Sequence, residues 1–318
     1  MILEKLGRDV VLGDGGMVFE LERRGYVSAG YFTPEAVIEC PEAVKQLHTD
    51  FARAGAEVLQ AFTYYAYESK LKQRGLDGAL GEINTGAISI ARSVADEYGA
   101  LVAGNLSNTW VYDPHDRSSD LPTRRQMEEQ LEIQMQNPPD FFVAETIEYL
   151  GEALIALEAI KSFGTTAMIT LGFKASDRTL DGFSLEEAFS RLEAKGADIV
   201  GINCFRDPPR MLPLLKRVRE TVGCFVASQP VAYRCSDEAP YFEAIRYQDR
   251  FAFPLELDPF VLTRYEMADY ALQAKDIGIN YIGGCCGTAP HHLRAMAEAL
   301  GREVPNSRYS PAAAFYPS

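Results

Sequence analysis

The sequence predicts an α/β fold, a (β/α)8 barrel of the TIM type, and three observations lead to this prediction. Short apolar runs alternate with longer segments of helical periodicity, and eight such pairs follow one another along the chain. The runs are apolar at every position rather than at alternate positions, as in parallel strands that are buried on both faces. The length of 318 residues is normal for one such barrel.

The expected strands and helices alternate in a regular order. We expect strands at 10–12, 58–62, 101–104, 141–145, 167–170, 199–203, 225–228 and 281–283. We expect helices at about 41–54, 80–98, 123–136, 149–163, 184–195, 211–222, 263–276 and 289–300. The first helix is bounded by Pro41 and Gly55, and Thr123 and Ser184 are the expected caps of the third and fifth helices.

The barrel is expected to occupy residues 1–301, followed by a polar tail at 302–318. The longest stretch without an assigned element, 231–260, joins the seventh strand to its helix on the face where barrel active sites lie. A doubly wound open sheet is the alternative fold. No Gly-x-Gly-x-x-Gly motif follows a strand, so the sequence does not support a dinucleotide site.

The composition argues against nucleic acid and membranes as partners. Lys plus Arg number 31 and Asp plus Glu number 45, and the resulting net charge of −14 opposes binding to a polyanion or an anionic membrane. No apolar run approaches the roughly 18 residues of a membrane helix, and the N-terminus lacks a signal-peptide pattern. Six cysteines in a chain of this length indicate reduced thiols and a cytoplasmic protein.

Three cysteines lie at or just after the carboxyl ends of expected strands. Cys285 and Cys286 follow two glycines at the end of the eighth strand, and Cys204 ends the run of the sixth. Strand ends of this kind face one mouth of a barrel, so we expect the three sulfurs to converge. Three thiolates would hold a zinc ion and leave its fourth position open for a substrate, as in catalytic zinc sites.

The vicinal cysteines have a second interpretation, as two small buried residues in a glycine-rich turn. A disulfide between them is not expected, because adjacent cysteines form a strained ring when they are bridged. The third cysteine at another strand end favours zinc. Cys40 and Cys224 are interpreted as structural, and Cys235, in the long loop, is a weaker candidate ligand.

A zinc ion with three thiolate ligands carries excess negative charge, so it is a poor Lewis acid for the activation of water. It is well suited to binding a fourth thiol, because it lowers the pKa of that thiol and keeps it nucleophilic near neutral pH. The expected reaction is therefore alkyl transfer to a thiol rather than hydrolysis.

Several segments together resemble the homocysteine S-methyltransferase family, and within it most closely the betaine–homocysteine enzymes. These segments are Asp14-Gly15-Gly16, Arg24-Gly25-Tyr26-Val27, Thr33-Pro34-Glu35-Ala36, Pro41-Glu42-Ala43-Val44, Phe62-Thr63-Tyr64-Tyr65-Ala66, Gly201-Ile202-Asn203-Cys204, Ser228-Gln229-Pro230 and the run from Tyr281 to Gly287. The resemblance extends from about residue 5 to residue 301. It implies a zinc-dependent enzyme that moves a methyl group from an onium donor to the thiol of homocysteine, giving methionine.

The resemblance also implies roles for single residues. The implied zinc ligands are Cys204, Cys285 and Cys286. Asp14 and Glu145, each at a strand end, would hold the homocysteine amino group, with Glu145 as part of the catalytic set. The backbone at Gly15 and Gly16 could approach the homocysteine carboxylate closely. From the residues alone, Asp14 could instead cap a turn, and Glu145 could be a surface carboxylate.

The donor site implied by the resemblance is aromatic. Phe32, Tyr64 and Tyr65 correspond to its cage, where ring faces bind a quaternary ammonium by cation–π attraction, with core packing as the alternative. Gln229 could donate a hydrogen bond to a donor carboxylate. The betaine enzymes have tryptophan in place of Phe32 and tyrosine in place of Thr146. These departures predict a different onium donor, such as a sulfonium or a bulkier betaine.

Two other functions stay open. One is a methyltransferase that uses S-methylmethionine or a folate, although the folate enzymes join this barrel to further domains that the sequence does not show. The other is a barrel that binds zinc or an onium solute without catalysis. A homo-oligomer is left open, but the chain ends near 318 without the long C-terminal arm of the vertebrate betaine enzymes, so we do not expect their tetramer.

Overall fold

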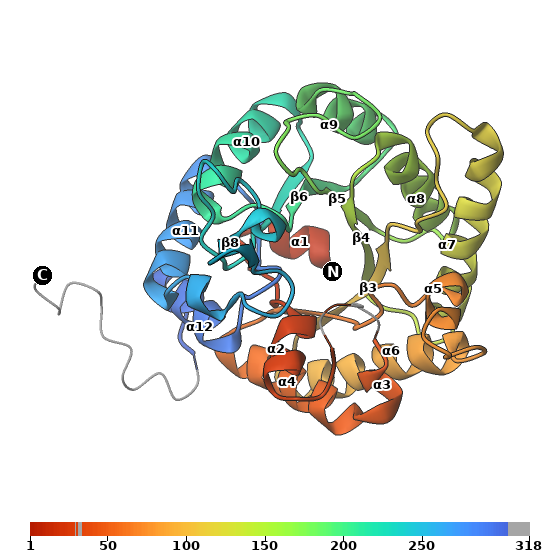
Figure 1. Ribbon diagram of the computed structural model, residues 1–318, viewed down its shortest axis with the longest axis horizontal. Coiled ribbons are helices and arrows are strands. Elements are labelled where there is room, and N and C mark those ends of the chain that lie inside the picture. The colour runs from red at the N-terminus through yellow and green to blue at the C-terminus, as the bar shows by residue number, and fades with distance from the viewer. Residues whose placement is uncertain (29, 31–33, 305–318) are drawn as a thin grey trace, which may run out of the picture.

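Eight parallel strands curl into a barrel, which confirms the predicted fold (Figure 1). The structure is a computed structural model that describes residues 1–28, 30 and 34–304. The barrel strands are β1 (Val11–Leu12), β2 (Val58–Gln60), β3 (Leu101–Ser107), β4 (Phe141–Ile147), β5 (Ala167–Leu171), β6 (Ile199–Asn203), β7 (Phe225–Gln229) and β10 (Tyr281–Ile282). Their order in the sheet is β1-β10-β7-β6-β5-β4-β3-β2, and all the pairs are parallel.

Hydrogen bonds outside the regular ladders connect β1 to β2 and close the barrel. The amide of Glu57 donates to the carbonyl of Leu12 (2.8 Å), and the Glu57 carboxylate accepts from the Leu12 amide (3.1 Å). Further toward the mouth, the Asp14 carboxylate accepts from the amide of Gln60 (2.8 Å). A side chain that the sequence places in the active site therefore also takes part in barrel closure.

An outer ring of helices surrounds the strands (Figure 1). The ring consists of α4 (Pro41–Ala54), α6 (Leu80–Tyr98), α7 (Asp120–Gln134), α8 (Leu150–Ser162), α9 (Leu185–Ala194), α10 (Pro208–Thr221), α11 (Arg264–Ile277) and α12 (Pro290–Ala299). Helices α4 and α6 have the predicted bounds, and each is followed by a glycine with positive φ, Gly55 (110°) and Gly99 (68°). No helix within the described ranges is long and apolar enough to cross a membrane.

The predicted start of α7 is wrong. This helix begins at Asp120, after the short 3-10 helix η2 (Arg117–Ser119), and Thr123 is buried inside it rather than capping it. Pro122 lies in the first turn, where a missing N–H is tolerated because the first amides of a helix have no intrahelical acceptor. By contrast, Ser184 caps α9 as predicted.

The structure adds short elements that the sequence does not predict. Before α6 they are α1 (Ile2–Leu6), α2 (Met17–Arg23), α3 (Ala36–Glu39) and α5 (Glu68–Lys72). Within 231–260 they are η3 (Phe242–Ala244), the hairpin of β8 (Arg246–Tyr247) and β9 (Arg250–Phe251), and η4 (Asp258–Phe260). Phe242 and Glu243 of this stretch reach the cavity at the barrel mouth, as its predicted position on that face requires.

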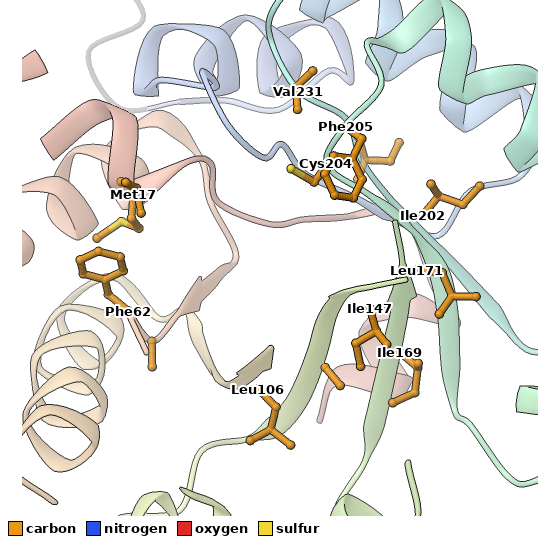
Figure 2. Packing of buried hydrophobic residues seen from close by; sticks show 14 of the residues in the cluster. Met17, Phe62, Leu106, Ile147, Ile169, Leu171, Ile202, Cys204, Phe205 and Val231 are labelled. Carbon is orange, nitrogen blue, oxygen red and sulfur yellow. The ribbon is translucent and has the colours of Figure 1, made fainter. Parts of the chain in front are cut away.

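Buried apolar side chains form two clusters. The larger one lies between the strands and the outer helices and extends to Cys204 and Phe205, just after β6 (Figure 2). The smaller one fills the interior of the barrel near the amino ends of the strands and includes Ile2 and Leu6 of α1. Figure 1 shows α1 in the centre of the ring. Helix α1 thus closes the bottom of the barrel.

The last described residues pack on the barrel. Arg302 donates to the Glu57 carboxylate (2.8 Å), and Val304 is buried. The rest of the predicted tail, 305–318, lies outside the described residues, so the domain division at 301 stays a prediction.

Candidate functional site

The three predicted cysteine ligands come together at the barrel mouth. Cys204 directly follows β6, and Cys285 and Cys286 follow β10. The three Sγ atoms lie within 4.8 Å of one another, with 3.7 Å between Cys204 and Cys286 and 4.0 Å between Cys285 and Cys286. Tetrahedral zinc with Zn–S distances of about 2.3 Å separates its sulfurs by about 3.8 Å. The cluster therefore has nearly the spacing that such an ion requires.

Glycines allow the turn after β10 to present both sulfurs to one point. A Cβ at Gly284 would collide with the side chain of Thr288. Gly287 has a φ of 81°, and a Cβ there would lie 2.7 Å from the ring of Tyr233. Larger residues at these positions would therefore push the turn away from Cys204.

The three thiols share negative charge through hydrogen bonds. Bonds from Cys204 and Cys286 hold the pKa of Cys285 well below its usual range. The hydrogen bonds of Cys204 with Cys285 and Cys286, followed by burial, raise the pKa of Cys204 well above its usual range. A cation at the centre would allow further ionisation, because ligand bonds would replace these hydrogen bonds. The chemistry of the donor set therefore fits a metal ion.

A cavity that is open at the barrel mouth adjoins the sulfurs. It is lined by all the predicted site residues that the structure describes, namely Asp14, Gly15, Gly16, Tyr64, Tyr65, Glu145, Thr146, Cys204, Gln229, Cys285 and Cys286. Phe32 lies outside the described residues. The fold thus gathers residues from the ends of β1, β2, β4, β6, β7 and β10 around one space.

Three side-chain amides hold the carboxylate of Glu145, which lies in β4. Gln60 and Asn105 donate to Oε1 at 2.7 Å each, and Asn203 donates to Oε2 at 3.1 Å. Burial and then the negative charge of Cys285 raise the pKa of Glu145 to about 8, against the effect of the amides. A desolvated carboxylate fixed in this way is suited to binding a cation.

The sequence did not identify these three amides as parts of the site. Gln60, Asn105 and Asn203 are polar residues within the apolar runs of β2, β3 and β6, and this is the signal that could have found them. Within the described residues, Gln60 Oε1, Asn105 Oδ1 and Gln229 Oε1 are buried and have no hydrogen-bond donor. Because buried polar atoms are nearly always paired, these oxygens are available to accept hydrogen bonds from the N–H groups of a ligand or from water.

Asp14 follows β1 and is only 2% exposed. Desolvation by burial raises its pKa to about 7, despite the hydrogen bond from the Gln60 amide. Gly15 and Gly16 line the same cavity, and the Gly16 amide donates to the carbonyl of Thr288 (3.0 Å). That amide already has an acceptor, so the approach of a substrate carboxylate to this segment stays a prediction.

We expect Asp14→Asn to stabilise the protein at pH 8, by roughly 1 to 3 kcal/mol, and less at pH 5. The pKa of Asp14 rises from its ordinary value of 3.8 to about 7, so the folded state retains a proton that the unfolded state loses between these values. Stability from this group therefore falls as pH rises from about 4 to 7. Asparagine keeps an acceptor for the Gln60 amide without the charge.

Thermal unfolding of the parent and Asp14→Asn proteins at both pH values, at equal metal content, measures this effect. A variant that gains no stability between pH 5 and pH 8 relative to the parent would contradict it.

Backbone strain is concentrated in the cavity wall. Of the described non-glycine residues with positive φ, all but Gln248 line the cavity. They are Tyr65 (57°), Trp110 (63°), Thr146 (57°), Cys204 (60°) and Phe205 (53°). Such conformations cost on the order of 1–3 kcal/mol each and tend to cluster at functional sites. The backbone conformations at the mouth of this barrel therefore lower the stability of the folded protein.

Aromatic rings line one part of the cavity. Tyr64 and Tyr65 lie side by side, with 4.2 Å between ring centroids and 3.4 Å between hydroxyl oxygens. Trp110, which the sequence did not single out, lies edge-on to Tyr65 at 6.0 Å and 69°. Phe205 and Phe242 add two further rings to the wall.

Comparison with known proteins agrees with this geometry. The family described as homocysteine S-methyltransferase matches residues 11–300. Betaine–homocysteine S-methyltransferase 1 of Mus musculus is 43% identical over 95% of this chain and 75% of its own length. S-methylmethionine–homocysteine S-methyltransferase of Rattus norvegicus is 37% identical over 95% of this chain and 82% of its own length.

Among solved structures, the metallated form of the homocysteine methyltransferase MmuM from Escherichia coli superposes with a TM-score of 0.76. The match covers 94% of this chain and 99% of that one at 21% sequence identity, so it supports the fold alone. The family match and the identity with the curated relatives confirm the predicted relationship: this chain belongs to the homocysteine S-methyltransferase family.

Proposed function

We propose that this chain is a zinc-dependent methyltransferase that moves a methyl group from a small onium donor to the thiol of homocysteine, giving methionine. Family membership supports homocysteine as the methyl acceptor. The observation that carries the metal assignment is the group of three sulfurs at near-tetrahedral spacing beside an open cavity. Zinc fits three thiolates with a free fourth position. Because these thiols must stay reduced, we also propose a cytoplasmic location.

The reaction forms one S–CH3 bond and breaks one bond of the donor. The homocysteine thiol first releases its proton to solvent, and the sulfur then supplies the electron pair that attacks the methyl carbon. The bond from that carbon to the donor nitrogen or sulfur breaks, and its pair stays on the donor, which leaves as a neutral amine or thioether. Cys204, Cys285 and Cys286 would hold the zinc ion, which would supply the positive charge that lowers the pKa of the fourth thiol. The surrounding residues align the sulfur and the methyl group.

The homocysteine ammonium is proposed to bind between Asp14 and Glu145. Both carboxyl groups are buried, line the same cavity and have raised pKa values, so a cationic partner favours their ionised forms. The unpaired oxygens of Gln60, Asn105 and Gln229 can accept further hydrogen bonds. A primary ammonium has three N–H donors, which suits this surplus of acceptors.

The donor is proposed to bind against Tyr64 and Tyr65, with Gln229 near its carboxylate. Relatives named for betaine and for S-methylmethionine match this chain at 43% and 37% identity, so similarity alone does not decide the donor. Thr146 is fixed by Asn203, whose amide donates to Thr146 Oγ1 (2.7 Å) and accepts from the Thr146 amide (2.8 Å). Because residue 146 is a threonine, this position adds no aromatic ring to the cavity.

We expect a dimethylsulfonium donor to give a kcat/KM at least about tenfold higher than glycine betaine. Each missing aromatic or hydroxyl contact removes roughly 0.5–2 kcal/mol of cation binding. A sulfonium leaves as a neutral thioether, which is a better leaving group than a tertiary amine and tolerates a looser site. Rates for the two donors in one preparation, with homocysteine saturating, measure the ratio. A preference for glycine betaine would show that other rings of the cavity, such as Trp110, compensate for Thr146.

Methionine formation from homocysteine by the purified protein, with a panel of onium donors, tests the function as a whole. The second candidate, a barrel that binds zinc or an onium solute without catalysis, predicts bound metal and no methionine with any donor. The convergence of Asp14, Glu145 and the three cysteines on one cavity favours the enzyme.

A further inference from the structure

Trp110 is the single tryptophan of the chain, and its position is unusual for so large an apolar residue. It follows β3, lines the cavity, and is 60% exposed. Its φ of 63° lies in the left-handed region, which is unfavourable for a residue with a bulky side chain. Burial in the core therefore does not account for the placement of this indole.

The rings of Trp110 and Tyr65 already bind a cation within the protein. The Lys70 ammonium lies 4.5 Å from the ring centroid of Trp110 and 5.3 Å from that of Tyr65. Both distances are within the range of cation–π attraction. Lys70 forms no salt bridge with a described residue, and the two ring faces are cation–π contacts of its ammonium group. Lys70 is not part of the cavity lining, whereas both rings are.

The charge of the cavity also favours a cation. Within the described residues, the carboxyl groups of Asp14, Glu145, Glu148 and Glu243 line the cavity, against the single lysine Lys174. Lys174 is itself paired with Glu148 (3.4 Å) and Glu243 (3.3 Å). A methylated onium group has no N–H donors, so ring faces rather than carboxylates are its most suitable direct contact.

We propose that Trp110 and Tyr65 together bind the cationic centre of the methyl donor, and that Trp110 determines donor affinity. This inference rests on the proposed function and adds a residue to its donor site. Thr146 in β4 lacks a ring, and Trp110, from the loop after the neighbouring strand β3, supplies one to the same cavity. The ligand class is a trimethylammonium or dimethylsulfonium compound.

The single tryptophan provides a direct test, because the intrinsic tryptophan fluorescence of the protein comes from this residue alone. The zinc-loaded protein is titrated with glycine betaine and with dimethylsulfonioacetate, in the presence of methionine to fill the acceptor site without turnover. The control is tert-butylacetate, which has the shape and the carboxylate of glycine betaine but lacks its positive charge. We expect a saturable fluorescence change with the onium compounds only. No response to either onium compound, or an equal response to tert-butylacetate, would overturn the proposal.

Substitutions of Trp110 test its contribution to donor binding by kinetics. Trp110→Leu is expected to raise the donor KM about three- to thirtyfold, and Trp110→Phe to keep it within about threefold of the parent. The homocysteine KM and the zinc content should change by less than about twofold, because Trp110 is proposed to touch neither the acceptor nor the metal. A donor KM that is unchanged in Trp110→Leu would overturn the proposal.

A matched control exists on β9. Phe251 is 58% exposed and has the Arg246 guanidinium 4.9 Å from its ring, but it does not line the cavity. Phe251→Leu should leave the donor KM unchanged, and a rise equal to that of Trp110→Leu would show a general effect of losing an exposed ring. Failure of the proposed function has a different signature, the absence of methyl transfer from every donor in the parent protein.

Discussion

Cys204→Ala is expected to abolish methyl transfer, with a loss of at least about a thousandfold, and to remove the bound metal. Protein purified without chelator should carry about one zinc per chain, and Cys285→Ala and Cys286→Ala should have the same effects. With two sulfurs, the site no longer fixes an ion with a single open position. The thiol acceptor then keeps its ordinary pKa and is mostly protonated at neutral pH.

Elemental analysis of metal content, methyl-transfer rate and thermal unfolding measure this prediction. The fold should survive, because the apolar clusters of the barrel do not depend on the metal. Cys224→Ala is the matched control, since Cys224 precedes β7 at the opposite end of the barrel and lies outside the cavity lining. Full zinc in any one of the three variants would remove that cysteine from the ligand set. All assays require reductant, because oxidation of the cluster would imitate metal loss.

Glu145→Gln is expected to lower kcat/KM for homocysteine at least about tenfold, which corresponds to about 1.4 kcal/mol. The substitution removes the charge that is proposed to hold the substrate ammonium. It also disturbs the hydrogen bonds from Gln60, Asn105 and Asn203, because glutamine places an NH2 group against one of these three donating amides. An unpaired buried donor adds a further cost.

Initial rates at varied homocysteine and saturating donor measure this effect. The control is Glu152→Gln, a buried glutamate of α8 that lies outside the cavity lining and accepts from Thr109. It should change stability without changing the homocysteine KM. Normal homocysteine kinetics in Glu145→Gln would mean that this carboxylate does not contact the substrate.

The sequence predicts the parts of the structure that depend on local signals. The bounds of α4 and α6 are correct because glycines with positive φ end both helices. The convergence of the three cysteines is predictable because each lies at or after a strand end, and a barrel brings such ends to one mouth. Thr123 shows the limit of this reasoning, because it is a favourable cap residue that the helix nevertheless includes.

Contacts between distant segments could not be predicted in the same way. Gln60, Asn105 and Asn203 belong to three different strands, and only the register of the barrel brings their amides to one carboxylate. Trp110 lies in a loop whose path depends on its neighbours, so its ring could not be placed in the cavity from local pattern. Helix α1 is shorter than two turns and is stabilised by packing rather than by propensity.

The closed bottom of the barrel determines the order in which substrates bind and products dissociate. Because α1 fills the amino end, both substrates must enter, and both products must leave, through the same opening. Glu145 is 8% exposed and Trp110 is 60% exposed, so the proposed acceptor position is deeper than the proposed donor position. A donor that arrives first therefore obstructs the path of homocysteine. The expected kinetic scheme is sequential and ordered, with homocysteine first to bind and methionine last to dissociate.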